Sequence, residues 1–143
     1  MTLAALRDDA LASTDDGFAL RLGLPWIRSL PVASLDGLEL VIDGEQVDPV
    51  LVALDGRLLD PSGLARERGW WFLQDRLVLR GWRMLRPGVH DVVVAFRLVI
   101  PYLQTAPDGP LILPFHVARA IRLDAPAAAP SVSRDVALIR RTP

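Results

Sequence analysis

The chain has 143 residues, the size of one domain, and 51% of them are hydrophobic. Its 16 basic and 17 acidic residues nearly cancel, which argues against an extended phosphate-binding surface and so against nucleic-acid binding. The absence of cysteine excludes disulfides and thiolate metal sites, no apolar run approaches the roughly 20 residues of a membrane span, and we expect a cytoplasmic location.

The first part of the chain combines turn signals with short runs of strand-forming residues. Residues 2–12 carry Leu3, Leu6 and Ala10 at helical spacing, so one short helix is expected there. Strands are then predicted over 18–24, 38–42 and 50–54. The dipeptide Asp-Gly, which favours tight turns because both residues tolerate positive φ, occurs along the chain at 16–17, 36–37, 43–44, 55–56 and 108–109.

The second part of the chain holds the longest predicted strand. Residues 61–69 predict one helical turn with Ser62 as its cap. Strands are predicted over 70–73, 76–80, 90–100 and 111–123, and the last of these reads as one bent strand or two. The first two flank Gln74-Asp75, which indicates a turn between them.

Many short strands with turn signals every ~8–12 residues predict an all-β protein. We expect a single-domain antiparallel β-sandwich, jelly-roll or immunoglobulin-like, with little helix, over residues 1–123. Residues 124–143 form a Pro/Ala-rich C-terminal tail that opens as a linker and can carry one late strand at 135–140.

One short motif is written twice in the chain. The stretches RLGLPW and RLVIPY both read Arg-Leu-x-(Leu/Ile)-Pro-aromatic. Because proline cannot donate to a sheet ladder, each strand is expected to lose its pairing at Pro25 and at Pro101. Trp26 and Tyr102 then lie at a rim, where such side chains are favoured anchors in interfaces and sugar sites. Chance or an old duplication is the alternative explanation.

No catalytic constellation is visible in the sequence. His90 and His116 are the only histidines and lack metal-ligand spacing, so no metal site is expected on this chain. His116 is the better candidate for the lip of a site, because an imidazole can face a sugar hydroxyl across a subunit boundary. The adjacent Asp8 and Asp9 point opposite ways on an extended chain, which predicts solvated loop charges rather than an acid pair.

The aromatic run Trp70-Trp71-Phe72 invites an interpretation as a sugar-stacking platform. On a strand, however, Trp70 and Phe72 share one face and Trp71 takes the other. We expect core on one side and a contact patch on the other, with core on both sides as the alternative.

Several blocks of the chain, in order, carry a family resemblance. They are Gly17-Phe18, Leu24-Pro25-Trp26-Ile27-Arg28, Ala33-Ser34-Leu35-Asp36 and Val41-Ile42-Asp43-Gly44-Glu45, followed by RGWWFLQDRLVLR and RPGVHDVVVAFRLVIPYL. Together they resemble the beta subunit family of bacterial C-glycoside deglycosidases over roughly residues 13–123. The chain departs from that family at Trp26-Ile27, where the family has Tyr-Tyr, and in the tail after Leu123.

The resemblance implies a small β-sandwich subunit that assembles with a larger alpha subunit. That partner would be a sugar-isomerase-like TIM barrel carrying the catalytic base and a divalent metal, Mn²⁺ or similar. The complex would be a carbon–carbon lyase that cleaves 3-oxo-C-glycosides by an elimination-type reaction, and this chain would supply no catalytic residue or cofactor.

On this resemblance, the predicted partner-interface or substrate-lip residues are Trp26, Arg28, Pro101, Tyr102 and His116. Arg28 would pair with a partner carboxylate or, as the weaker alternative, with a substrate phenolate. A free-standing β-sandwich module that binds carbohydrate or protein without catalysis is the main alternative function. A small β-barrel enzyme using His116 is a third, disfavoured by the lack of a second convergent acid or base.

Overall fold

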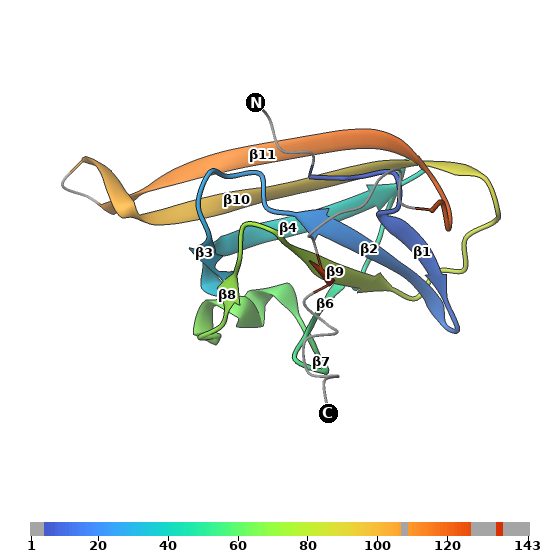
Figure 1. Cartoon of the computed structure of the whole chain (residues 1–143), viewed down its shortest axis with the longest axis horizontal. Coiled ribbons are helices and arrows are strands. Elements are labelled where there is room, and N and C mark those ends of the chain that lie inside the picture. Colours follow the sequence, from blue (N-terminus) through green and yellow to red (C-terminus); the bar gives the residue numbers. More distant parts are fainter. Residues whose placement is uncertain (1–4, 107–108, 127–133, 136–143) are drawn as a thin grey trace.

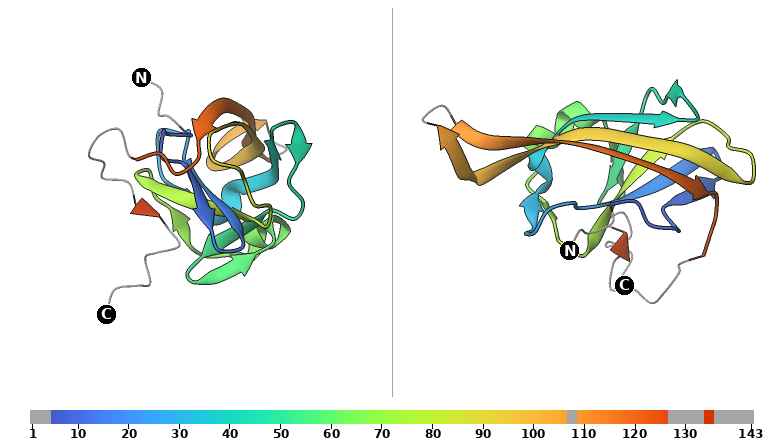
Figure 2. Two further views of the ribbon diagram at one scale, coloured as in Figure 1. Left: turned by 90° about the vertical axis from the view of Figure 1, so that its right-hand side faces the viewer. Right: turned by 90° about the horizontal axis from the view of Figure 1, so that it is seen from above.

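Two β-sheets packed face to face make up the body of the protein (Figures 1 and 2). The computed structural model describes residues 5–106, 109–126 and 134–135. The strands are β1 (Leu11–Thr14), β2 (Gly17–Gly23), β3 (Leu30–Pro31), β4 (Leu35–Ile42), β5 (Glu45–Gln46), β6 (Leu51–Leu54), β7 (Arg57–Leu59), β8 (Trp70–Trp71), β9 (Asp75–Gly81), β10 (Val89–Ala106), β11 (Gly109–Arg122) and β12 (Arg134–Asp135). Two 3-10 helices, η1 (Val32–Ser34) and η2 (Pro61–Arg66), complete the described part.

The first sheet has the strand order β1-β2-β9-β6-β7, with β12 paired in parallel to β9. The second has the order β11-β10-β4-β5, and β3 pairs with β8 in a separate short ribbon. All pairings except that of β12 are antiparallel, and the sheets do not close into a barrel. The predicted all-β sandwich is therefore confirmed.

The core forms where the alternating strands of the two sheets meet. In β2 the residues Phe18, Leu20 and Leu22 are buried, and in β10 the residues Phe96, Leu98 and Ile100 are buried opposite them in the sandwich. Period-two alternation aims each of these sets at one face of its strand, so burying that face fixes the strand register. No helix among the described residues is long and apolar enough to cross a membrane.

The helix predicted over residues 2–12 is absent from its described part. Residues 5–10, called here the N-terminal strap, run irregularly beside β2, and β1 begins at Leu11. Gly23 N–H donates to the Ala5 carbonyl at 2.8 Å, and Arg21 N–H donates to the Ala10 carbonyl at 2.8 Å. The backbone hydrogen bonds thus go to a neighbouring strand, and pairing with the sheet replaces the local helix.

Two further local predictions concern a helical turn and a tight turn. The helical turn after residue 60 is capped by Asp60 rather than Ser62, because Asp60 Oδ1 accepts from Ser62 N–H at 2.9 Å. Aspartate followed by proline at the first helical position is a favoured helix start. The turn predicted around Gln74 is present, because Asp75 N–H donates to the Phe72 carbonyl at 2.9 Å. The strands on either side of it do not pair with each other: β8 pairs with β3, while β9 pairs with β2 and β6.

The Asp-Gly dipeptides fill two different roles. Asp43-Gly44 and Asp55-Gly56 make hairpin turns as predicted, with positive φ at both residues of each pair. Asp36-Gly37 instead lies inside β4, opposite a register shift between Ala95 and Arg97 of β10. A positive φ at Gly37 there lets the strand take up one extra residue as a bulge.

The C-terminal tail is described only in part. The predicted late strand at 135–140 corresponds to β12 at Arg134–Asp135, and positions 136–140 lie outside the described residues. Before it, Asp124 is fixed to β1, because its carboxylate accepts from Ser13 N–H at 2.8 Å and from Ser13 Oγ at 2.6 Å. This contact joins the edge strands of the two sheets.

Candidate functional site: an aromatic and arginine cluster at one end of the sandwich

The two copies of the repeated motif converge in space. β2 ends at Gly23 and β10 comes from the opposite sheet, yet Trp26 Nε1–H donates to Tyr102 Oη at 2.6 Å. Trp26 is half-buried against the core, whereas Tyr102 is 42% exposed. The predicted rim of Trp26 and Tyr102 is thus a single contact at one end of the molecule.

A bulge in β10 gives Tyr102 its position. Ile100 pairs with Leu111, but the next pair is Gln104 with Pro110, so residues 101–103 have no partner in β11. Pro101 has no N–H to donate, which makes loss of the ladder at this point inexpensive. Bulges re-aim side chains in this way. As expected, pairing is lost after β2 and at Pro101, but β10 resumes at Gln104 and does not end.

Arg28 completes the cluster. Its guanidinium carbon lies 4.6 Å from the centroid of the Tyr102 ring, a cation–π arrangement. Both side chains are largely accessible, and among the described residues no carboxylate pairs with Arg28. Since stacking occupies only the face of the guanidinium, its N–H groups at the edge are available to an acceptor from outside the chain.

Exposed apolar side chains surround this cluster. Ile27 is 75% exposed between Trp26 and Arg28. Leu73 lies on the loop between β8 and β9. This loop is joined to the loop of Ile27 and Arg28 by a hydrogen bond from Leu73 N–H to Ser29 Oγ at 2.7 Å. The other exposed apolar residues of this end are Trp70, Phe72 and Leu103. An apolar surface around a single cation resembles the composition of protein interfaces.

The aromatic run of β8 divides as its alternation predicted. Trp71 is fully buried and its Nε1–H donates to the Asp75 carbonyl at 3.2 Å. Trp70 and Phe72 are both about half exposed on the other side. The buried face of Trp71 is therefore confirmed and core on both sides is excluded, while the contact role of the exposed face stays a prediction.

His116 lies away from the cluster. It pairs with Ala95 in the β10–β11 ribbon, seven residues before Tyr102, which corresponds to roughly 20 Å along the strand. Its side chain is on the exposed outer face of β11. Trp26, Arg28 and Tyr102 are thus brought together with exposed Pro101 in the bulge beside them, whereas His116 is not.

The other histidine has a structural environment. His90 is buried, its Nδ1 lies 2.6 Å from Asp43 Oδ2 and its Nε2 lies 2.7 Å from the Arg86 carbonyl oxygen. Both neighbours accept hydrogen bonds, so both ring nitrogens donate only when the imidazole is protonated. The Asp43 hydrogen bond accordingly raises the pKa of His90, and the same contact lowers the pKa of Asp43. No group of three metal-ligating side chains comes together among the described residues.

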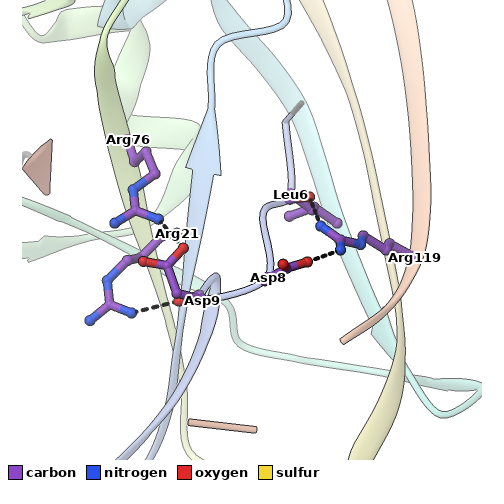
Figure 3. Close-up of polar contacts among 6 residues, drawn as sticks. All are labelled: Leu6, Asp8, Asp9, Arg21, Arg76 and Arg119. Atoms are coloured by element: carbon purple, nitrogen blue, oxygen red, sulfur yellow. Dashed lines mark hydrogen bonds and ion pairs between the residues drawn. The ribbon is translucent and has the colours of Figure 1, made fainter. Parts of the chain in front are cut away.

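The acids of the N-terminal strap are not free loop charges (Figure 3). Asp8 and Asp9 do point opposite ways, as predicted, but each meets an arginine. Asp9 Oδ1 accepts from Arg76 Nη1 at 2.8 Å, and Asp8 pairs with Arg119 of β11. Burial raises the pKa of Asp9, but the Arg76 hydrogen bond and charge outweigh it, so the pKa is lowered. The prediction of solvated charges is wrong because these acids join the strap to both sheets.

Sequence comparison identifies relatives of the chain, although no family model matches it. It is 32% identical over 102 residues to the 3'-dehydrocarminate deglycosidase beta subunit of a Microbacterium species, covering 68% of this chain and 77% of the relative. It is also 32% identical over 102 residues to the C-glycoside deglycosidase beta subunit of Arthrobacter globiformis, covering 66% and 76% of the two chains. The chain belongs to the C-glycoside deglycosidase beta subunit family.

A third member of the C-glycoside deglycosidase beta subunit family, from Microbacterium trichothecenolyticum, is 33% identical over 89 residues, covering 59% of this chain and 68% of the relative. The family resemblance read from the sequence blocks is therefore confirmed. All three relatives are named as beta subunits, which supports an accessory role beside another subunit.

Two side chains of this end were missed by sequence reasoning. Leu103 is 41% exposed in the bulge, and Ile112 is 53% exposed on the outer face of β11. One signal was present in the sequence: between Leu98 and Ala118 the only residue with a full charge at neutral pH is Asp108. A long, uncharged pair of strands indicates a surface that is covered by something else.

Proposed function

We propose that this chain is the beta subunit of a heteromeric C-glycoside deglycosidase. Its partner would be a TIM-barrel alpha subunit that carries the divalent metal and the catalytic base. The observation that carries the proposal is the one-third identity to three proteins named as beta subunits of such deglycosidases, over two thirds or more of their lengths.

The reaction proposed for the complex is an elimination. A 3-oxo group makes the hydrogen on the neighbouring sugar carbon, C2, acidic, so a base of the alpha subunit can remove that proton. Breaking the bond from C1 to the aromatic carbon then leaves a C1–C2 double bond in the sugar, and the aromatic carbon takes up a proton. This chain contributes no group to these steps in the proposal and acts by assembly.

The end of the sandwich with Trp26, Arg28, Pro101 and Tyr102 is the proposed docking end. Its support is the geometry: exposed aromatic and apolar side chains surround an arginine whose edge has no partner within the described residues. Aromatic residues and arginine are the types most enriched at energetically important interface positions. His116 lies roughly 20 Å along the ribbon from Tyr102, so it is not part of this cluster.

Reconstitution tests this function. The chain is expected to show no cleavage of 3-oxo-C-glycosides alone, and to restore cleavage when combined with the TIM-barrel protein of the neighbouring open reading frame and Mn²⁺. The measurement is release of the free aglycone, followed by chromatography. Full activity of the isolated chain, or no activity and no complex with the barrel, would overturn the proposal.

A further inference from the structure

The distal part of the β10–β11 ribbon has fewer sheet neighbours than the part that lies beside β4. β4 pairs with β10 only between Val92 and Leu98, so beyond Leu98 the two strands have only each other as sheet neighbours. Figures 1 and 2 both show the ribbon projecting past β3 and β8. We call residues 99–103 and 109–114 the arm. The inner face of the arm packs on the core through buried Ile100 and the partly buried Leu111 and Leu113.

The arm exposes apolar side chains outside the Trp26–Tyr102 contact. Leu103 is exposed in the bulge, and Ile112, paired with Val99, is exposed on the outer face. Neither strand of the arm contains a charged residue. Proteins usually protect free sheet edges with charges, so an uncharged apolar arm is a surface that would associate with itself unless a partner covered it.

The prolines of the arm restrict how a partner can cover it. Pro101, Pro110 and Pro114 lack the N–H that a newly added strand would need for its ladder. Over a stretch this short, three missing donors leave no regular edge for strand addition, including addition of a second copy of β11. Packing of side chains against the arm is the mode of contact that remains.

Charge identifies the kind of partner. Arg28 lies at the base of the arm, held against Tyr102, and presents N–H donors to the outside. An acceptor-rich, negatively charged group fits these donors, and a partner protein can supply it as an Asp or Glu at the margin of an apolar surface. A second copy of this chain would bring another uncharged arm and another Arg28, which repel rather than complement each other.

We propose that the arm is the assembly element of this subunit: the alpha subunit packs against its outer face and its bulge, and pairs a carboxylate with Arg28. The inference rests on the proposed function for the identity of the partner. It goes beyond that function by assigning the contact to a defined projecting segment and by including the outer face, which carries Ile112.

The test compares two outward-facing positions of β11. Ile112 lies in the arm and Ala120 lies over the body, paired with Asp91, and both side chains are exposed. Ile112→Arg is expected to weaken binding to the alpha subunit by roughly a hundredfold, because it places an unpaired charge in an apolar contact. Ala120→Arg is expected to leave binding within about threefold of the wild type. Affinity is measured by calorimetry, with circular dichroism to confirm that both variants are folded.

A second measurement does not depend on substitution. Tyr102 is the only tyrosine, so fluorotyrosine labelling gives a single ¹⁹F resonance that reports on the arm. We expect this resonance to shift on addition of the alpha subunit, and amide exchange in 109–114 to slow. If wild type binds and is active but Ile112→Arg binds equally well, or if exchange slows only through self-association of this chain, the arm inference is overturned while the proposed function stands.

Discussion

Tyr102 owes its role to the residue before it. Pro101 removes one ladder donor, three residues of β10 leave the pairing, and the Tyr102 hydroxyl then meets the Trp26 indole at 2.6 Å. If β10 continued its regular pairing, the Trp26 and Tyr102 side chains would not meet in this way. The contact also supports Arg28, which stacks on the tyrosine ring. The missing N–H of Pro101 thus helps to form a cluster that presents the N–H donors of Arg28 among exposed apolar side chains.

Gly81 is required by the aromatic ring opposite it. It pairs with Phe18 across β2 and β9, and a Cβ at this position would lie 2.4 Å from the Phe18 ring. Because Phe18 is fully buried, its ring cannot move away freely. Gly81→Ala is expected to lower the free energy of unfolding by about 1–3 kcal/mol, as overpacked core variants do.

Urea unfolding measures this effect, and Gly63 provides the control. A Cβ at Gly63 meets nothing within 4 Å, and its φ is not positive. Gly63→Ala should therefore be neutral or slightly stabilising. Equal losses of stability in both variants would show that contact with Phe18 is not the cause.

His90 makes stability depend on pH in the neutral range. Its raised pKa means that the folded state favours the protonated ring, so the stabilisation is complete below the ordinary histidine value of about 6.5 and is lost as pH rises through the raised value. Asp43→Asn removes the carboxylate, while asparagine still tolerates the positive φ of 52° at this turn.

The expected result is a difference in stability between wild type and Asp43→Asn that shrinks as pH increases from 5.5 to 8.5. Urea unfolding at each pH gives this difference directly, and contributions from other titrating groups cancel. A difference that stays constant over the range would contradict a protonated His90 in the folded protein.

At the scale of elements, sequence patterns identified strands better than their partners. Alternation placed β2, β6 and β9 close to their observed bounds and located β4 and β10 without their full length, because period-two burial is a local property of each strand. The pairing of β8 with β3 and the bulge at 101–103 were not predictable, since both depend on residues far apart in sequence. The rim of Trp26 and Tyr102 could be foreseen, but not that the two side chains touch.

The N-terminal strap shows the same limit. Leu6 and Ala10 are both buried, but their spacing in the sequence suggested a helix. The strap takes its shape from contacts with the sheets. Arg119 of β11 donates to the Leu6 carbonyl at 2.6 Å and pairs with Asp8. These contacts join residues far apart in sequence, so no local sequence pattern predicts them.

Removing this contact tests how the strap is held. Arg119→Met keeps the apolar stem and removes the guanidinium, and we expect it to lower the free energy of unfolding by about 0.5–1.5 kcal/mol, since the pair is partly exposed. Amide exchange in residues 5–10 should become faster. Arg122→Met on the same strand, where the described residues provide no partner, should change stability by less than about 0.5 kcal/mol. If both variants behave alike, Arg119 does not hold the strap.

At the scale of the whole molecule, the sandwich is joined along one side and carries exposed apolar side chains at one end. Asp124, which follows β11, binds Ser13 of β1, and Arg119 of β11 binds Asp8 of the strap. Together with the backbone hydrogen bond from Asp124 N–H to the Leu11 carbonyl at 2.8 Å, these contacts connect the two sheets along this side. The opposite situation holds at the arm, where uncharged strands extend beyond the body. A rigid body with one uncovered projection is the shape expected of a subunit.

The bulge at 101–103 also separates the register of the two strands from the reach of the side chains between them, two properties that are usually linked in a sheet. Ile100 with Leu111 and Gln104 with Pro110 fix the register on either side of it, so the number of residues between them can change without moving a core side chain. Lengthening or shortening this short segment alters only how far its aromatic residue reaches. Homologous chains can therefore adapt to differently shaped partners by insertion or deletion at this one place, with the sandwich left unchanged.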